Sequence, residues 1–209
     1  MIEVEVKFLI DTVPDSLKKL APSRAKRQLD VYYDTLEYTL LRSGNFMRIR
    51  NKKRLEFKLN SGDASHLYCE ELDFELQKLH EHLEAIIQIL RSIGLQSPEK
   101  VQSVEDILCS NDMIVLATID KERVEYDFSD NITVCVDHVN NLGNFIEIDL
   151  MVKNDNSLLA TSKEAEVSLM KVLSDNDIIS DETSRVRLGY VELFLQKYNP
   201  DAYGMGLYK

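Results

Sequence analysis

With 209 residues, the chain is long enough to bury one continuous core, so we expect a single domain over residues 1–209. A formal net charge of -11 argues against a general binder of nucleic acids or anionic membranes, because both need a basic face. The apolar runs are too short to span a bilayer and no signal-peptide pattern opens the chain, so we expect a soluble, cytoplasmic protein. Cys69, Cys109 and Cys135 are odd in number and far apart in sequence, which supports neither a disulfide framework nor a C-x-x-C motif.

Alternation of apolar and polar residues predicts nine strands. In chain order they cover residues 2–10, 26–34, 46–51, 54–60, 66–76, 113–120, 122–128, 131–139 and 145–153. Several of the segments between them are short and rich in Gly, Asn, Asp and Ser, which is typical of hairpins. Neighbouring strands are therefore expected to pair antiparallel.

Helical spacing of apolar residues is clearest over residues 75–95, where Gly94 is a plausible C-terminal cap. Weaker patterns predict helices at residues 15–20, 103–109, 162–173 and 186–198, the last of which ends before Pro200. Strands and helices do not alternate strictly along the chain. This order favours an α+β fold with helices packed outside a sheet or barrel.

Charged residues occupy one face of most predicted strands. Residues 2–8 place Glu3, Glu5 and Lys7 on one face and four apolar side chains on the other. Other strands carry basic residues at alternate positions: Arg48, Arg50, Arg54, Lys58, Lys121 and Arg123. A third group carries acidic residues in the same way: Glu71, Asp73, Asp137, Glu147 and Asp149.

For a single strand, a solvated face over a core explains such alternation. Across nine strands, an open sheet would not require the signs to be segregated by strand. A closed antiparallel barrel of about eight strands would bring these charges into a polar interior, where they persist if paired, hydrated or bound to ions. Carboxylates opposite Arg and Lys suit a polyanion with divalent cations such as Mg²⁺. The glycines form no phosphate-binding loop motif that would compete with this reading.

An ordered series of motifs resembles the CYTH superfamily, the triphosphate tunnel metalloenzymes. The series is Glu3-x-Glu5-x-Lys7, Tyr32-Tyr33-Asp34-Thr35, Met47-Arg48-Ile49-Arg50, Phe57-Lys58, Lys121-x-Arg123, Val136-Asp137 and Leu142-Gly143-x-Phe145-x-Glu147-x-Asp149. Residues 194–203 resemble the end of thiamine-triphosphatase-like members. The resemblance implies a closed eight-stranded antiparallel β-barrel with helices outside, dependence on Mg²⁺ or Mn²⁺, and action on a triphosphate.

The resemblance also implies roles for individual residues. It assigns substrate binding to Lys7, Arg48, Arg50, Lys58, Lys121, Arg123 and Arg187. It assigns metal binding to Glu3, Glu5, Glu71, Asp137, Glu147 and Asp149, and catalysis to Glu5, Arg48, Arg123 and Asp137. Asp137 matches a position that supports either the metal or a basic neighbour. Glu71 is preferred to Glu70 by strand parity, that is, by which face of the strand alternate residues occupy. Arg187 is preferred to Arg185 as the basic residue near the C-terminus that closes the barrel. Asp149 stands where the family usually has Glu.

Three functions follow as hypotheses. The leading one is metal-dependent hydrolysis of thiamine triphosphate, inorganic tripolyphosphate or a nucleoside triphosphate. The alternative is a class IV adenylyl cyclase that converts ATP to cyclic AMP and pyrophosphate, because a shared fold does not fix the reaction. The third, ranked low, is a non-catalytic polyphosphate- or nucleotide-binding module, which would not need a complete acidic set. The expected partner is a small-molecule triphosphate, without nucleic acid or membrane, and the protein is expected to be a monomer or homodimer.

Overall fold

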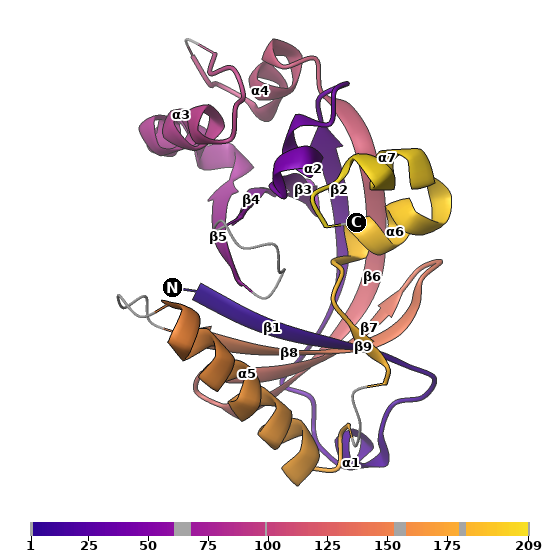
Figure 1. The fold of residues 1–209 in the computed structure, drawn as a ribbon. Coiled ribbons are helices and arrows are strands. Elements are labelled where there is room, and N and C mark those ends of the chain that lie inside the picture. The colour runs from indigo at the N-terminus through magenta and orange to yellow at the C-terminus, as the bar shows by residue number, and fades with distance from the viewer. Residues whose placement is uncertain (1, 61–67, 99, 153–157, 180–182, 209) are drawn as a thin grey trace. The chain divides into compact units, whose positions relative to one another are not determined.

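The computed structural model describes residues 2–60, 68–98, 100–152, 158–179 and 183–208 (Figure 1). Its strands form one sheet in the order β5-β4-β3-β2-β6-β7-β8-β1-β9. Their bounds are β1 (Ile2–Ile10), β2 (Arg24–Asp34), β3 (Phe46–Arg50), β4 (Arg54–Asn60), β5 (Tyr68–Glu75), β6 (Ile114–Ser129), β7 (Ile132–Val139), β8 (Gly143–Val152) and β9 (Arg185–Val186). The predicted α+β class and large antiparallel sheet are confirmed.

The predicted closed barrel is not confirmed. Strand β1 pairs along its whole length with β8, from Ile2 opposite Val152 to Ile10 opposite Asn144. Its pairing with β5 covers only two positions, Glu3 opposite Cys69 and Val4 opposite Tyr68. Closure into an eight-stranded barrel therefore stays a prediction, and so does the single domain expected from the chain length.

The helices lie between and after these strands. They are α1 (Asp15–Lys18), α2 (Thr39–Ser43), the 3-10 helix η1 (Leu76–His82), α3 (Leu83–Ser92), α4 (Val104–Ser110), α5 (Leu158–Asp175), α6 (Tyr190–Tyr198) and α7 (Pro200–Met205). No helix in the described part of the chain is both long and apolar enough to cross a membrane.

Four predicted elements were wrong in extent. The helix expected over residues 75–95 is a 3-10 helix followed by an α-helix, with non-helical backbone at Lys78. The two strands expected over residues 113–128 are one continuous strand, β6, because no Gly or Pro interrupts the alternation. The helix expected from Val186 begins at Tyr190, because Arg185 and Val186 pair with β1 instead.

Residue contacts divide the chain into two compact units. The first unit comprises Met1–Gln28, Ser65–Cys69 and Asp120–Gly189, and the second comprises Leu29–Ala64, Glu70–Ile119 and Tyr190–Lys209. In the first unit, α5 lies along β1 and β8 (Figure 1) and covers their apolar face. Val4, Val6 and Phe8 of β1 are buried in that core, which leaves Glu5 and Lys7 on the opposite face of the strand.

The second unit has a separate core, in which the apolar faces of β3 and β4 pack with α3 and α4. Met47, Leu55, Phe57, Ile86 and Ile107 are almost completely buried there. Alternation along β3 then places Arg48 and Arg50 on the other face. In both units, burial of the apolar face fixes the orientation of the strand. The opposite face then carries the charged residues that the sequence predicts.

The motif Tyr32-Tyr33-Asp34-Thr35 has a structural role at Asp34. This fully buried carboxylate accepts hydrogen bonds from the backbone N–H groups of Thr35, Leu40 and Leu41, at 2.8, 2.9 and 2.8 Å. Burial raises the pKa of Asp34, although the three N–H donors oppose that shift. Asp34 thereby satisfies donors at the start of α2, which otherwise lack partners within the helix. It fixes the chain between β2 and β3.

Candidate active site

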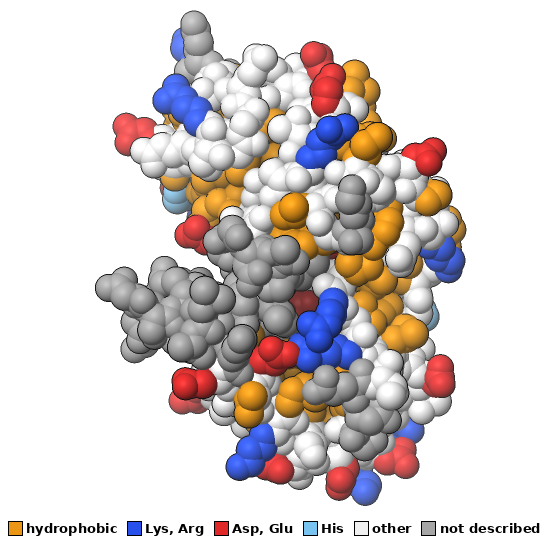
Figure 2. Space-filling model, in the orientation of Figure 1, with side chains coloured by type: hydrophobic (Ala, Val, Ile, Leu, Met, Phe, Trp, Pro, Cys, Tyr) orange, Lys and Arg blue, Asp and Glu red, His pale blue; other side chains and the backbone are white. Residues whose placement is uncertain are grey.

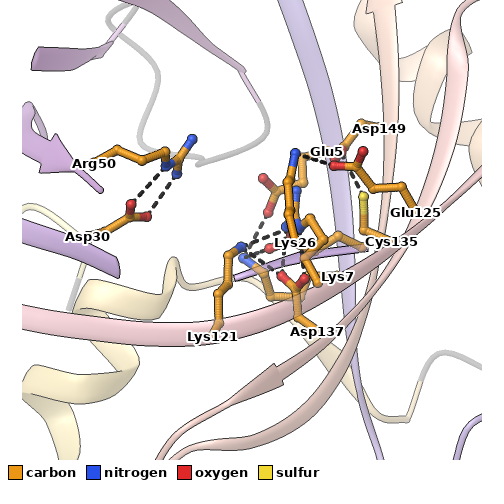
Figure 3. A network of polar contacts seen from close by, with 12 residues as sticks. Glu5, Lys7, Lys26, Asp30, Arg50, Lys121, Glu125, Cys135, Asp137 and Asp149 are labelled. Carbon is orange, nitrogen blue, oxygen red and sulfur yellow. Dashed lines mark hydrogen bonds and ion pairs between the residues drawn. The ribbon is translucent and has the colours of Figure 1, made fainter. Parts of the chain in front are cut away.

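Charged side chains of the first unit meet on the face of β1, β6, β7 and β8 that is opposite the apolar core. We call them the first-unit cluster, and its members are Glu5, Lys7, Lys121, Arg123, Asp137, Glu147 and Asp149. Cross-strand register brings them together, because Lys7 is opposite Glu147, Glu5 is opposite Asp149, and Arg123 is opposite Asp137. Figure 3 shows Lys7, Lys121 and Asp137 with their side chains pointing toward one another.

Three carboxylates of this cluster form a group that could hold a cation. Glu5, Glu147 and Asp149 each offer an oxygen, and these oxygens lie within 4.8 Å of one another. An all-oxygen donor set of this kind suits a hard divalent cation such as Mg²⁺. Glu3, also predicted as a ligand, lies in β1 opposite Met151, and its side chain is outside the described part of the structure.

Glu147 is the electrostatic centre of the first-unit cluster. It is buried, and its carboxylate lies 3.1 Å from Lys7 Nζ and 4.0 Å from Lys121 Nζ, and in contact with Arg123. Burial alone would raise its pKa, but Arg123, Lys7 and Lys121 hold the pKa of Glu147 well below its ordinary value. Lys7 also lies 2.8 Å from Glu5. Glu147 is therefore an ionised carboxylate at neutral pH.

Asp137 binds basic residues and lies outside the group of three carboxylates. It is fully buried and accepts hydrogen bonds from Lys121 Nζ at 2.7 Å and from Arg123 Nε and Nη2 at 2.7 and 2.6 Å. Burial and the neighbouring Arg123 lower the pKa of Lys121, while Glu147 and Asp137 oppose this shift. Of the two roles predicted for Asp137, these contacts match the support of a basic neighbour.

Three neighbours of the first-unit cluster were missed in the sequence. The Cys135 thiol donates a hydrogen bond to Asp149 Oδ2 at 3.7 Å, and burial raises the pKa of this thiol. Lys26 of β2 forms an ion pair with Glu125 of β6 (Figure 3). The alternation of side chains along a strand could have revealed two of them, because Glu125 shares a face with Lys121 and Arg123, and Cys135 shares one with Asp137.

A second set of charges lies on β2, β3, β4 and β5 of the second unit. We call it the second-unit cluster, and its members are Asp30, Tyr32, Arg48, Arg50, Glu56, Lys58 and Glu71. Arg50 donates from Nε and Nη2 to the two carboxylate oxygens of Asp30, at 2.7 and 2.8 Å (Figure 3). Arg48 donates from Nε to Glu56 at 2.8 Å and from Nη1 to the Tyr32 hydroxyl at 2.9 Å. Asp30, Tyr32 and Glu56 were not predicted as site residues.

The structure places Glu71 in the second-unit cluster. Its carboxylate lies 3.2 Å from Lys58 Nζ and 4.0 Å from Arg48 Nη2. Partial burial alone would raise the pKa of Glu71, but Lys58 and then Arg48 lower it to about 2. Glu71, which the sequence analysis preferred to Glu70, thus lies beside two of the predicted substrate-binding residues, and its role in the site stays a prediction.

Arg187, which was expected to bind substrate, is not brought to either cluster by a described contact. It is exposed, and it makes no ion pair with any residue in the described ranges. Arg185 instead forms an ion pair with Glu166 of α5. Nearby, Lys7 Nζ donates to the Leu188 carbonyl oxygen at 3.4 Å. The role of Arg187 in binding substrate stays a prediction.

Both clusters contain cations and carboxylates in similar number. The first-unit cluster has three cations and four carboxylates, and the second has three of each. On the face shown in Figure 2, Lys and Arg side chains are interspersed with acidic and apolar ones. The clusters are thus local arrangements of fixed charges, suited to a small, highly charged ligand.

Known proteins resemble this chain in sequence and in fold. A family model described as the CYTH domain matches residues 1–179. A pre-mRNA-splicing factor, SYF1 of Dictyostelium discoideum, is 32% identical over 103 residues. That match covers 47% of this chain and 12% of the splicing factor, so the chain spans only a small part of this relative's length.

Several solved structures are similar in fold. A conserved hypothetical protein from Pyrococcus furiosus has a TM-score of 0.59 and 23% identity, covering 91% of this chain and 99% of that one. A putative adenylate cyclase from Vibrio parahaemolyticus has a TM-score of 0.56 and 16% identity, covering 93% and 98%. A putative adenylyl cyclase from Hippeastrum, described as having a dominant triphosphatase activity, has a TM-score of 0.57 and 16% identity, covering 90% of each chain. At these identities the likeness shows the fold alone.

Proposed function

The chain belongs to the CYTH domain family, and we propose that it is an enzyme that hydrolyses a triphosphate with Mg²⁺ or Mn²⁺. The observation that carries the proposal is the group of Glu5, Glu147 and Asp149 lying among Lys7, Lys121 and Arg123. Carboxylates hold a divalent cation, and the adjacent cations bind phosphate oxygens. The closed β-barrel implied by the family resemblance is part of this proposal, and the pairing of β1 with β5 supports it.

The donor chemistry fits a hard cation. Glu5, Glu147 and Asp149 would hold it, because their oxygens already lie within 4.8 Å of one another and no softer ligand is required. When bound, the cation offsets the negative charge that develops on the phosphate oxygens. Glu147 is kept ionised by Arg123, Lys7 and Lys121, which suits it to this role over a wide pH range.

The protein's own residues then bind the phosphate oxygens, orient the attacking water and stabilise the charge that develops. Lys7, Lys121 and Arg123 of the first-unit cluster bind phosphate oxygens. The family resemblance implies the same role for Arg48, Arg50 and Lys58. Water attacks the terminal phosphorus, the bond to the bridging oxygen breaks, and negative charge moves to the departing phosphates. Arg123 stabilises that charge, because Asp137 holds it in place before the reaction. Glu5, with a side chain that is 21% exposed, orients the attacking water.

Adenylyl cyclase activity is the second candidate, favoured by the fold likeness to two putative adenylyl cyclases. In that reaction the ribose 3′-hydroxyl replaces water as the attacking group and pyrophosphate leaves. A non-catalytic binding module ranks below both, because it would not need the three grouped carboxylates.

A substrate panel tests the proposal. Purified protein with Mg²⁺ or Mn²⁺ is incubated with thiamine triphosphate, inorganic tripolyphosphate and ATP, and the products are identified by mass spectrometry. Release of phosphate from at least one compound is expected. Cyclic AMP and pyrophosphate from ATP would establish the cyclase instead, and the absence of any product from the panel would reject both activities.

A further inference from the structure

The two arginines of the second-unit cluster are held by two buried carboxylates, each of which contacts both of them. Asp30 accepts both hydrogen bonds of its pair with Arg50, and it lies 3.4 Å from Arg48 Nη1. Glu56 lies 2.7 Å from Arg48 Nη2 and 3.1 Å from Arg50 Nη1. Asp30 is 2% exposed and Glu56 is 8% exposed. The four side chains therefore form one interlocked group with little freedom to rearrange.

These contacts use a particular edge of each guanidinium group. The edge formed by Nε and Nη2 is taken by Asp30 on Arg50 and by Glu56 on Arg48. That edge is one of those by which arginine binds an oxyanion with two parallel hydrogen bonds. On Arg50, Nη1 and Nη2 each carry two hydrogens and each contact one carboxylate, so a second hydrogen on each nitrogen points elsewhere. Arg50 therefore has more N–H groups than its contacts with Asp30 and Glu56 can use.

The Tyr32 hydroxyl completes the arrangement on Arg48. It accepts a hydrogen bond from Arg48 Nη1 at 2.9 Å, and its ring packs edge-on against Phe46, with the ring centroids 6.3 Å apart. Tyr32 is buried, so its position is set by packing and not by the arginine. Burial raises the pKa of Tyr32, which keeps the hydroxyl neutral. Arg48 is therefore held by the Tyr32 hydroxyl and by the carboxylates of Glu56 and Asp30.

We infer that Asp30, Glu56 and Tyr32 are positioning residues, which orient Arg48 and Arg50 so that the end edge of Arg50 is presented to a phosphate group. This inference rests on the proposed function. Donors that are ordered before binding lose little conformational entropy when the ligand arrives, which strengthens binding. The alternative role for the two carboxylates is to cancel positive charge, and it predicts the opposite effect, because removing a nearby negative charge would then strengthen phosphate binding.

Steady-state hydrolysis of inorganic tripolyphosphate by Asp30→Asn and Glu56→Gln separates the two roles. Positioning predicts a KM raised about tenfold with kcat changed less than about threefold, because the lost interaction acts on binding. Tyr32→Phe removes only the hydroxyl and is the mildest variant; it is expected to raise KM about threefold. An unchanged or lowered KM in Asp30→Asn and Tyr32→Phe overturns the inference.

Two controls make the result specific. Glu84→Gln removes one exposed negative charge from α3 of the same unit and is expected to leave KM unchanged. Thermal unfolding identifies variants that fold poorly, and Tyr32→Phe decides the matter if the carboxylate variants do not fold. If the wild-type protein binds tripolyphosphate without turnover, only the proposed hydrolysis is rejected. Calorimetric binding of metal-free tripolyphosphate then compares the affinities of the variants and the wild type in place of KM. A wild-type protein that neither binds nor hydrolyses tripolyphosphate overturns both.

Discussion

Arg123 donates two hydrogen bonds to Asp137, from Nε at 2.7 Å and from Nη2 at 2.6 Å, and Asp137 is completely buried. Lys121 Nζ shares the same carboxylate at 2.7 Å. Asp137 is thus the common anchor of two cations that face Glu147. A carboxylate used in this way controls the direction of its basic partners and need not contact the metal.

The Asp137→Asn variant tests that role. We expect kcat/KM to fall by about 100-fold, because Arg123 and Lys121 lose the charge that orients them, and stability to fall by about 3 kcal/mol. The concentration of Mg²⁺ that gives half-maximal activity should change much less than kcat/KM, because Asp137 is not among the three grouped carboxylates. A large rise in that concentration would instead identify Asp137 as a metal ligand.

Glu5→Gln should abolish turnover while leaving the binding of metal-free tripolyphosphate largely intact. The variant removes a charge from the group of three carboxylates but leaves the cations of the cluster in place. Turnover is measured by phosphate release, and binding by calorimetry in the presence of a chelator. The matched control is Glu122→Gln, which removes an exposed negative charge from β6. Unchanged turnover in Glu5→Gln would remove Glu5 from the mechanism.

Removal of divalent cations should reduce phosphate release to background. Mg²⁺ or Mn²⁺ should restore it, because the three grouped carboxylates offer oxygen ligands only. The measurement is turnover after dialysis against a chelator, followed by titration of each ion. Full activity after exhaustive removal of metal would contradict the assignment of Glu5, Glu147 and Asp149 as metal ligands.

Asp34→Ala should act on stability and not on chemistry. The substitution leaves the N–H groups of Leu40 and Leu41 without their acceptor at the start of α2. A loss of about 2 kcal/mol in the free energy of unfolding is expected, since a cap and buried hydrogen bonds are both lost. Asp15→Ala changes an exposed acidic residue in the first turn of α1 and should lower the free energy of unfolding far less in the same denaturant titration.

The three cysteines should differ in reactivity. Cys109 is exposed, whereas Cys69 and Cys135 are buried. Burial also raises the pKa of Cys135 and so suppresses the reactive thiolate. Brief treatment of native protein with iodoacetamide, followed by peptide mass spectrometry, should therefore label Cys109 alone. Labelling of Cys135 at the same rate would show that the site opens to solvent more than the structure indicates.

Strand parity predicted most of the charged faces, because a buried apolar face on one side of a strand dictates what the other side presents. Glu5, Lys7, Arg48, Arg50 and Glu147 were found in this way. Their partners were harder to predict. Asp30 shares its face with a lysine, a glutamine and a tyrosine, so its strand shows no single sign of charge, and its contact with Arg50 depends on the register between β2 and β3.

Glu56 was missed for a related reason. It lies between Arg54 and Lys58 at alternate positions, and the sequence suggested a basic face. Only the pairing of β3 with β4 shows that Glu56 stands opposite Arg48. The break between η1 and α3 was likewise hidden, because apolar spacing continues through both and a 3-10 turn differs little from an α-turn in its periodicity.

Lys7, Lys121 and Arg123 surround Glu147, so the protein carries its own counterions where a divalent cation is expected to bind. Its carboxylates are thus not left to repel one another when no metal is present. Folding should therefore not depend on metal, unlike that of small domains built around a structural zinc ion. It also follows that free metal competes with lysine and arginine for the same oxygens. The ion should bind more readily as a complex with its triphosphate, which occupies those cations, than by itself.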